Sequence, residues 1–351
     1  MNNKALLLIS LGTPDKASFF SVARYLSQFL GDRRIVNIPA ILRFILVNLI
    51  IVPFRSYSSS KAYKQVWTDR GSPLKYHMED LTEKVAKQMK NTHDVFYAMR
   101  YQNPSIKNQL KIIEQKGYDE IVLLPVFPQY SSATHGSFIE ESLKIISKWE
   151  VIPSIRTIDQ FYDNEMYLDA FVDNINQFEM SEYDQVIFSY HGLPVSQLDS
   201  VYSEGKCSDR ICEQGVTGDN HHCYKATCYE TTKLLMKKLK LESSKVTTSF
   251  QSRLDSKWVE PFSDKVIEQL GKSGAKKILV VSPSFTGDCL ETIIEIGDEY
   301  DELFKNHGGQ KLDYVPSLNS SDKWVECIVE LVQSARSVSY THLTLPTICS
   351  V

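Results

Sequence analysis

Five carboxylates recur at steps of three and four residues just after the apolar run 277–281. They are Asp288, Glu291, Glu295, Asp298 and Glu302. On an α-helix, at about 100° per residue, this spacing would place all five within one arc of roughly 80°. No Lys or Arg lies between Asp288 and Phe304 to offset the repulsion between them. The pattern is typical either of a solvated acidic face or of a path for cations or protons.

A histidine near the middle of the chain favours the second interpretation. His191 follows the apolar segment Gln185–Tyr190 in the sequence SYHGLP, where Gly192 and Pro194 favour a sharp turn. Such a turn holds an imidazole at the end of a strand, and an imidazole that titrates near neutrality is a suitable general base. A lone histidine after a strand is often structural, so it is the combination with the carboxylates that indicates chemistry.

Four of the seven cysteines are clustered in the spacing C-x4-C-x10-C-x4-C. They are Cys207, Cys212, Cys223 and Cys228. Clustered cysteines in a reducing compartment favour metal ligation over disulfides. The gaps of four residues match neither the usual zinc-ribbon spacing nor a standard iron–sulfur spacing. His221 and His222, beside Cys223, are further candidate zinc ligands.

Strands and helices are expected to alternate along the chain and to position these residues. Apolar segments predict buried strands at Ala5–Leu11, Val95–Arg100, Glu120–Phe127, Gln185–Tyr190, Val246–Phe250 and Lys277–Ser282. Helical patterns cover Met78–Lys90, Ile106–Lys116, Ser137–Trp149, Met166–Asn176, Tyr229–Leu239 and Pro261–Lys272. This alternation predicts an α/β fold with parallel strands. The carboxyl ends of parallel strands face the ligand crevice, so we expect His191 and the acidic segment to line one cleft.

A pattern that occurs twice in the sequence indicates two related halves. The segment Lys116–Pro125 reads as helix end, glycine, buried strand and proline, and Lys272–Pro283 repeats this order about 156 residues later. The junction is expected near residues 151–163. Neither G-x-G-x-x-G nor G-x-x-x-x-G-K-[ST] occurs in the sequence, which argues against nucleotide binding through those loops.

Composition narrows the functional class. The 351 residues carry a net charge of −4 without a basic block, which argues against nucleic-acid binding. The first apolar run, Ala5–Leu11, is too short for a signal peptide, so a cytoplasmic location is expected. The stretch Ile41–Phe54 is expected to be too short to span a bilayer and to form either a buried helix or an exposed apolar lip. Residues 337–351 lack a helical period and are expected to be a non-native tail outside the fold.

Six motifs, in order along residues 4–336, resemble the ferrochelatase family. They are LLLISLGTPD, RGSPL, FYAMRYQNPSI, LPVFPQYSSATHGS, SYHGLP and FTGDCLETIIEI. The resemblance implies an α/β fold of two similar Rossmann-like halves, each a four-stranded parallel sheet flanked by helices, with the active-site cleft between them. The halves would be residues 1–160, with the lip at about 38–54, and residues 161–336, with the cysteine insert at 207–228. It also implies insertion of Fe²⁺ into protoporphyrin IX, with release of two protons.

The resemblance also implies roles for individual residues. His191 and Glu291 would be catalytic, and His191, Glu291, Asp288 and Glu295 would contact the metal. Cys289 stands where the family often has a second histidine, and the helix with the carboxylates is widened to a π-helix in the family. The porphyrin would be bound by Tyr97, Met99, Arg100, Tyr101, Tyr130, Ser131, Leu193 and Pro194.

Partners and cofactors follow from the same resemblance. The apolar lip would admit a porphyrin from a membrane or a partner, with the protein peripheral to the inner face of that membrane. Some microbial members of the family hold a [2Fe–2S] cluster on cysteines, so the insert is expected to hold such a cluster, with structural Zn²⁺ as the alternative and an empty site as the third. Coproporphyrin III as substrate and a non-catalytic tetrapyrrole- or metal-binding protein remain the alternative functions, and the oligomeric state is left open.

Overall fold

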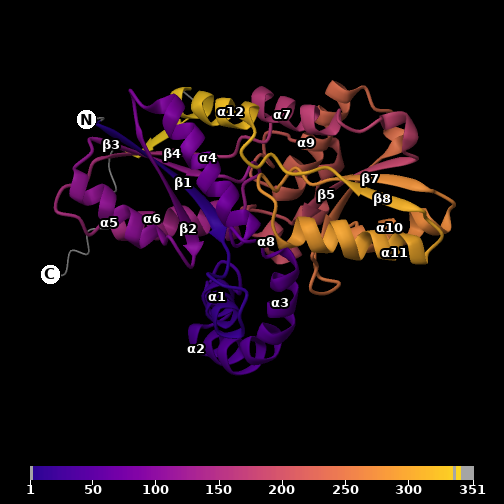
Figure 1. Cartoon of the computed structure of the whole chain (residues 1–351), viewed down its shortest axis with the longest axis horizontal. Coiled ribbons are helices and arrows are strands. Elements are labelled where there is room, and N and C mark those ends of the chain that lie inside the picture. The colour runs from indigo at the N-terminus through magenta and orange to yellow at the C-terminus, as the bar shows by residue number, and fades with distance from the viewer. Residues whose placement is uncertain (1–2, 335–336, 341–351) are drawn as a thin grey trace.

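Two parallel sheets with the same strand order form the centre of the molecule (Figure 1). The computed structural model describes residues 3–334 and 337–340. The parallel strands of the first sheet have the order β2-β1-β3-β4, with the short antiparallel strand β9 (Ser337–Tyr340) beside β4, and the second sheet has the order β6-β5-β7-β8. The strands of the first are β1 (Lys4–Gly12), β2 (Asp94–Tyr101), β3 (Glu120–Pro125) and β4 (Ser154–Ile158). Those of the second are β5 (Gln185–His191), β6 (Val246–Gln251), β7 (Lys277–Val281) and β8 (Lys311–Tyr314). Equivalent strands occupy equivalent places, which confirms the two similar halves.

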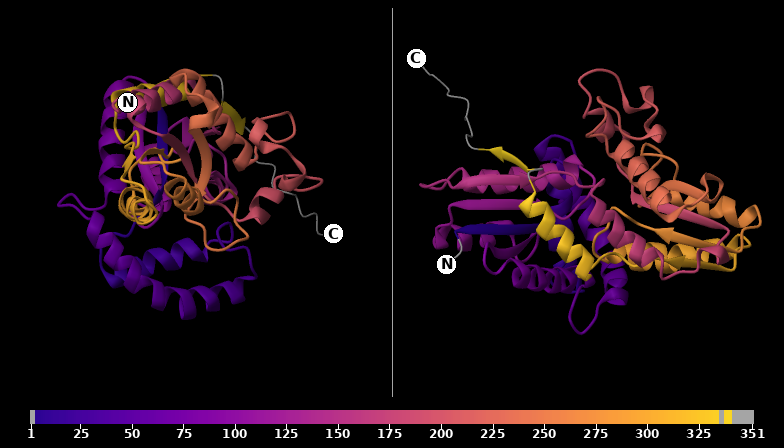
Figure 2. Two further views of the ribbon diagram at one scale, coloured as in Figure 1. Left: turned by 90° about the vertical axis from the view of Figure 1, so that its right-hand side faces the viewer. Right: turned by 90° about the horizontal axis from the view of Figure 1, so that it is seen from above.

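Helices cover the sheets, and the two halves lie side by side along the long axis of the molecule (Figures 1 and 2). The first half contains α1 (Phe19–Gly31), α2 (Ala40–Ile45), α3 (Val52–Val66), α4 (Pro73–Met89), α5 (Ile106–Lys116) and α6 (Ser137–Ile146), with π-helices η1 (Leu46–Ile51) and η2 (Ser132–Gly136). The second contains α7 (Glu165–Ile175), α8 (Val195–Asp199), α9 (Tyr224–Leu239), α10 (Ser263–Lys272), α11 (Asp301–Asn306) and α12 (Asp322–Gln333). It also contains the π-helix η7 (Glu291–Tyr300) and the 3₁₀ turns η3 (Met180–Glu182), η4 (Cys207–Asp209), η5 (Cys212–Gln214) and η6 (Ser243–Lys245).

The central strand β1 is buried on both faces. Leu6 and Leu8 point into one core cluster, whereas Leu7 and Ile9 point into another. Because successive side chains of a strand alternate between faces, a strand covered by helices on both sides must be apolar throughout. This is why the run ALLLI could be recognised as a strand in the sequence.

The largest core cluster extends across both halves, and each half also has a cluster of its own. The largest cluster combines Leu6 and Val122 of the first sheet with Phe188 and Leu279 of the second. Trp324 of α12 is fully buried in the same cluster. Helix α12 contacts both α4 and α7, so the last described helix ties the two halves together.

Three short strands were not predicted: β4, β8 and β9 (Ser337–Tyr340). Strand β8 lies at a sheet edge and contains Lys311 and Asp313, so it has no apolar run to indicate it. Strand β9 pairs antiparallel with β4. The sequence analysis placed residues 337–340 outside the fold, and the non-native origin of this tail stays a prediction. The remainder of that expected tail, residues 341–351, lies outside the described residues.

Helices α1 and α3 project from one side of the molecule, with α2 at their far end (Figure 1). From α2 through η1 to α3 the chain forms one continuous helix, Ala40–Val66. Its side chains Ile41, Phe44 and Leu49 are exposed, and Phe54 is 78% exposed. The stretch 38–54 was expected to be either a buried helix or an exposed apolar lip, and it forms the exposed lip. The whole helix, Ala40–Val66, has 27 residues and, by length and composition alone, is long and apolar enough to cross a membrane. The stretch Ile41–Phe54 was expected to be too short for this.

Candidate active site and cysteine centre

His191 is the last residue of β5, and its turn is sterically fixed. A Cβ atom on Gly192 would lie 2.8 Å from the carbonyl oxygen of Gln251, so only glycine fits there. Pro194 caps the short helix α8 that follows. The side chain of His191 is partly exposed and lies near the rings of Trp258 and Phe285, with ring centroids 6.3 and 6.2 Å away.

One hydrogen bond determines the tautomer of His191. Its Nδ1 lies 2.6 Å from the carbonyl oxygen of Gly192. Because a carbonyl oxygen can only accept, Nδ1 carries the hydrogen, and the lone pair of the neutral ring is on Nε2. Within the described residues Nε2 has no hydrogen-bond partner. His191 is thus prepared to accept a proton, or to bind a metal ion, through Nε2.

The helix with the carboxylates is a π-helix, Glu291–Tyr300, continued by α11. A π-helix has i→i+5 hydrogen bonds, so the α-helical steps of three and four do not keep side chains on one face. Asp288 precedes the helix, Glu291 and Glu295 are half-buried, and Asp298 and Glu302 are exposed. The predicted single arc of five carboxylates was therefore wrong, whereas the widened helix agrees with the expectation from the family resemblance.

Asp288 and Glu295 are both held by several hydrogen bonds. Asp288 accepts from Tyr314 at 2.9 Å, from Asn319 at 2.7 Å and from the amide of Ser317 at 3.2 Å. Glu295 accepts from the amide of Ser252 at 2.8 Å and also from its hydroxyl. Carboxylates held in this way are fixed in position and have few lone pairs left for a passing cation.

Glu291 differs from its neighbours, because no hydroxyl, amide or cationic donor is bound to it among the described residues. It lies near the thiol of Cys289 and the buried phenols of Tyr25 and Tyr63. Burial, with the negative charge of Glu291 adding to it, raises the pKa of Tyr63 well above its usual value, so this phenol stays protonated. Tyr25 and Tyr63 belong to α1 and α3, so the lip helices supply the surroundings of Glu291.

Two of the expected porphyrin contacts belong to a structural network in the first half. Arg100 binds the carboxylate of Asp32 at 2.8 Å and the hydroxyl of Ser137 at 2.8 Å. The hydroxyl of Tyr101 donates to the same carboxylate at 3.0 Å, and its ring is 1% exposed. A propionate bound by Arg100 would therefore have to compete with Asp32.

The other expected porphyrin contacts are dispersed. Met99 is fully buried, and Tyr97 donates a hydrogen bond to Glu79 at 2.9 Å. Ser131 caps η2 by accepting from the amide of Thr134, and Tyr130 lies against His135 and His222.

Only Leu193 and Pro194 adjoin His191 along the chain. Pro194 and Trp258 help to line a surface hollow of about 560 Å³ beside the turn. Trp258 and Tyr63 were missed by the sequence analysis, because they are distant in sequence from the residues that they surround and no motif marks them. Phe285 begins the motif FTGDCLETIIEI, but it was not assigned a place beside His191.

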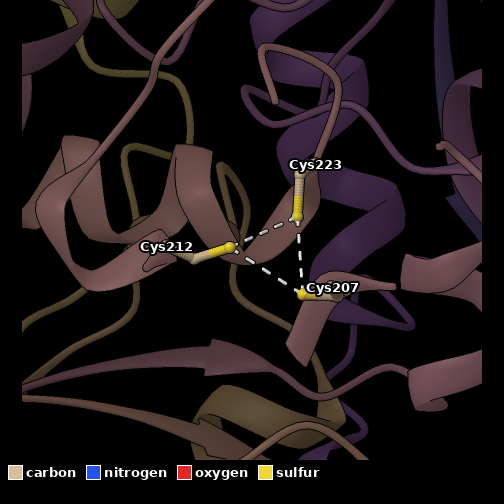
Figure 3. A group of neighbouring side chains, drawn as sticks. All are labelled: Cys207, Cys212 and Cys223. Carbon is tan, nitrogen blue, oxygen red and sulfur yellow. Dashed lines mark hydrogen bonds between the residues drawn. The ribbon is translucent and has the colours of Figure 1, made fainter. Parts of the chain in front are cut away.

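Three of the four clustered cysteines meet in space. The Sγ atoms of Cys207, Cys212 and Cys223 form a triangle with sides of 3.8, 3.9 and 4.0 Å (Figure 3). All three residues are buried and belong to the largest core cluster. Hydrogen bonds from the other two thiols lower the pKa of Cys223, and the amide of Ala226 in the first turn of α9 adds to this effect.

Cys228 does not join this triangle, contrary to the predicted four-cysteine site. It lies five residues after Cys223, which caps the amino end of α9. Cys228 lies near enough to Cys223 to interact with it electrostatically, but its sulfur is not one of the three grouped potential ligand atoms. Burial raises the pKa of the Cys228 thiol, which is typical of a core cysteine.

The cysteine insert also contacts the first half. Gln160 donates to the carbonyl oxygen of His221 at 2.6 Å, and Nε2 of His222 lies 3.5 Å from the carboxylate of Asp159. His222 therefore faces Asp159 and Tyr130, and it is not part of the cluster of potential metal ligands formed by the sulfurs.

Comparison with known proteins gives a consistent result. A family model described as Ferrochelatase matches residues 3–336. A ferrochelatase of Legionella pneumophila (strain Lens) is 40% identical over 333 residues, which cover 94% of this chain and 98% of that protein. A ferrochelatase of Coxiella burnetii (strain Dugway 5J108-111) is 38% identical over 345 residues, covering 95% and 94%.

Among solved structures, SirB from Bacillus subtilis with Fe³⁺ superposes with a TM-score of 0.53 at 11% identity and covers 95% of this chain and 94% of SirB. This likeness supports the fold alone.

Proposed function

Because the chain belongs to the ferrochelatase family, and is thus an enzyme of haem biosynthesis that inserts a metal into a porphyrin, we propose that its metal is Fe²⁺ and its porphyrin protoporphyrin IX. The reaction forms protohaem and releases two pyrrole protons. The observation that carries the assignment of the site is the tautomer of His191, whose Nε2 lone pair is free at the end of β5. The residue roles below are part of the proposal.

His191 accepts a pyrrole proton through Nε2 in this mechanism. The hydrogen bond from Nδ1 to Gly192 stabilises the imidazolium that results, because the carbonyl oxygen faces the positive ring. Trp258 and Phe285 limit the positions that the ring can take. General base catalysis of this kind contributes roughly 10²–10⁴ in rate.

Glu291 receives the proton or the incoming cation. It is half-buried and is bound by the thiol of Cys289, a weak donor, in place of the several strong donors that hold Asp288 and Glu295, so its oxygens are less constrained. Carboxylates bind a hydrated divalent cation less tightly than thiolates do, so a carboxylate can pass the cation on to the porphyrin without retaining it. Asp288 and Glu295 are proposed as fixed negative charges along the path of the cation or proton. Glu295 lies farther along the helix than Glu291.

The exposed lip is proposed as the contact with a membrane, at the inner face of which a cytoplasmic enzyme would attach peripherally. Ile41, Phe44 and Phe54 are exposed apolar side chains on one helix, and Arg43 and Arg55 provide charge beside them. An apolar porphyrin could pass from the bilayer to the site along this surface.

The cysteine insert is proposed to bind a metal that takes no part in the insertion step. A [2Fe–2S] cluster requires four ligands, two on each iron, and three described cysteines are grouped. The alternative expectation, a structural Zn²⁺ ion, requires fewer thiolates when another ligand completes the site.

Anaerobic incubation of the purified protein with ferrous iron and protoporphyrin IX tests the proposal. The Soret and visible bands should change from those of the free porphyrin to those of protohaem. The same assay with coproporphyrin III tests the alternative substrate, and a higher kcat/KM on that porphyrin would replace the assignment of protoporphyrin. Tight porphyrin binding without metal insertion would instead support the non-catalytic alternative.

A further inference from the structure

The cysteine triangle has the size expected of a single tetrahedral ion. Zn–S bonds of about 2.3 Å at tetrahedral angles hold two sulfurs about 3.8 Å apart. The three distances between the Sγ atoms of Cys207, Cys212 and Cys223 are 3.8, 3.9 and 4.0 Å. We propose that these three thiolates bind one thiophilic divalent ion of the Zn²⁺ type, and that its fourth ligand is not a cysteine.

Neither a disulfide nor simple core packing accounts for this arrangement as well. A disulfide requires an S–S distance of about 2.05 Å between one pair, whereas all three pairs here are equally far apart. Core packing of small apolar groups also gives no reason for three thiols to converge on one point, with each sulfur next to the other two. Equal separation is the natural result of a common central ion.

A [2Fe–2S] cluster fits these sulfurs poorly. Such a cluster takes two thiolates on each iron, so sulfurs on different irons lie farther apart than sulfurs on the same iron. Three nearly equal distances cannot be divided between two irons. The fourth candidate, Cys228, lies on α9 and is not grouped with the other three sulfurs.

The fold fixes the positions of two of the ligands. Cys223 occupies the N-cap position of α9, directly before the first residue of that helix. The amide of Cys207 donates to Asp199 at 2.9 Å, which fixes the backbone of the first ligand. The chain therefore positions two of the ligands before any ion arrives.

Tyr202 is a positioning residue for this site. Its hydroxyl is buried, has no conventional hydrogen-bond partner among the described residues, and interacts with the sulfur of Cys223. The guanidinium of Arg210 covers its ring at 3.7 Å, which fixes the ring in place. Hydrogen bonds to ligand atoms from outside the coordination sphere typically change metal affinity by about 10- to 100-fold.

Metal content of the full-length protein, purified without chelators, tests the proposal. We expect one zinc ion per chain, without inorganic sulfide. Cys228→Ser should keep the ion, and Cys223→Ser should lose it, while Cys327→Ser, a buried cysteine on α12, serves as the matched control. Two irons and two sulfides per chain, loss of the ion in Cys228→Ser, or metal-free wild-type protein would each overturn the proposal.

Titration of the metal-stripped wild-type protein with Co²⁺ gives a readout that depends on no cysteine variant. A single site with three thiolates predicts saturation at one equivalent, with sulfur-to-cobalt charge-transfer bands and tetrahedral d–d bands. Tyr202→Phe should weaken binding by about tenfold and leave one equivalent bound. Saturation at another stoichiometry would contradict the single site. None of these measurements uses a porphyrin, so their failure is distinct from failure of the proposed chelatase reaction.

Discussion

The hydroxyl of Tyr300 donates a hydrogen bond to Oε1 of Glu295 at 2.8 Å, from a position five residues later in the chain. This spacing equals the hydrogen-bonding step of the π-helix that contains Glu295. Together with Ser252, Tyr300 fixes the carboxylate of Glu295 and leaves Glu291 as the less constrained acid of the same helix. The two glutamates should therefore respond differently to the same substitution.

Glu291→Gln should slow iron insertion by about 100-fold, because it removes the group that accepts a proton or cation but keeps the shape. Steady-state metalation of protoporphyrin measures this change. Glu295→Gln is the matched comparison, and its main effect should be on stability, because a neutral amide, whose nitrogen cannot accept, replaces the charged acceptor of the hydrogen bonds from Ser252 and Tyr300. Equal kinetic losses in both variants, with unchanged melting temperatures, would contradict this distinction.

His191→Ala should abolish general base catalysis and lower kcat by at least about 100-fold. Porphyrin affinity should stay within about tenfold, because the variant removes a chemical group more than binding area. Quenching of porphyrin fluorescence measures the affinity, and the absorbance assay measures kcat. Wild-type insertion rates in this variant would remove His191 from the mechanism.

The lip should control attachment to lipid. Replacing Leu49 and Phe54 by Ser removes two exposed apolar side chains, each able to contribute about 1.5–3 kcal/mol when fully buried. Binding to phosphatidylglycerol-containing vesicles in a sedimentation assay should fall by at least about tenfold. Val151→Ser is the control, because Val151 is 82% exposed but lies outside the lip. If both variants bind vesicles as the wild-type protein does, the lip does not contact the membrane.

Local signals predicted the central elements well. Helix α5 has the predicted bounds, Ile106–Lys116, because Ser105 caps its start and Gly117 adopts a positive φ of 68° at its end. The buried strands β1, β3 and β7 were recognised from apolar runs. Strands β4 and β8 were not, because short strands near a sheet edge have no such run.

The site was less predictable, because its geometry depends on tertiary contacts. Counting residues at 3.6 per turn cannot show that Glu291–Tyr300 is a π-helix, and only the family resemblance gave that expectation. The cysteine spacing is symmetric in the sequence, yet the helix that begins after Cys223 separates Cys228 from the other three. From the sequence alone, Arg100 was a reasonable candidate to bind an anionic group of the porphyrin, but in the structure it is paired with Asp32.

The pH dependence of stability should report on that partnership. Burial acts to raise the pKa of Asp32, but hydrogen bonds from Ser137 and the amide of Arg34, with the charge of Arg100, outweigh it and hold the pKa below its usual value. Because the folded state then binds fewer protons than the unfolded state, Asp32 stabilises the fold above its unfolded pKa of about 3.9. That contribution is lost as the pH falls through the lower pKa of the folded state.

Asp32→Asn should therefore lower the free energy of unfolding by about 3 kcal/mol at pH 7, because Arg100 would lose the carboxylate 2.8 Å away and keep only the more distant one of Glu141, at 3.9 Å. Urea denaturation at a series of pH values measures the difference between variant and wild type. The difference should begin to shrink below about pH 4, where the unfolded state takes up a proton, and should disappear as the pH falls through the lower pKa of the folded carboxylate. Glu114→Gln, an exposed acid on α5, is the control and should change little at any pH. A difference for Asp32→Asn that is constant from pH 7 to pH 3 would mean that shape, and not charge, is what Asp32 contributes.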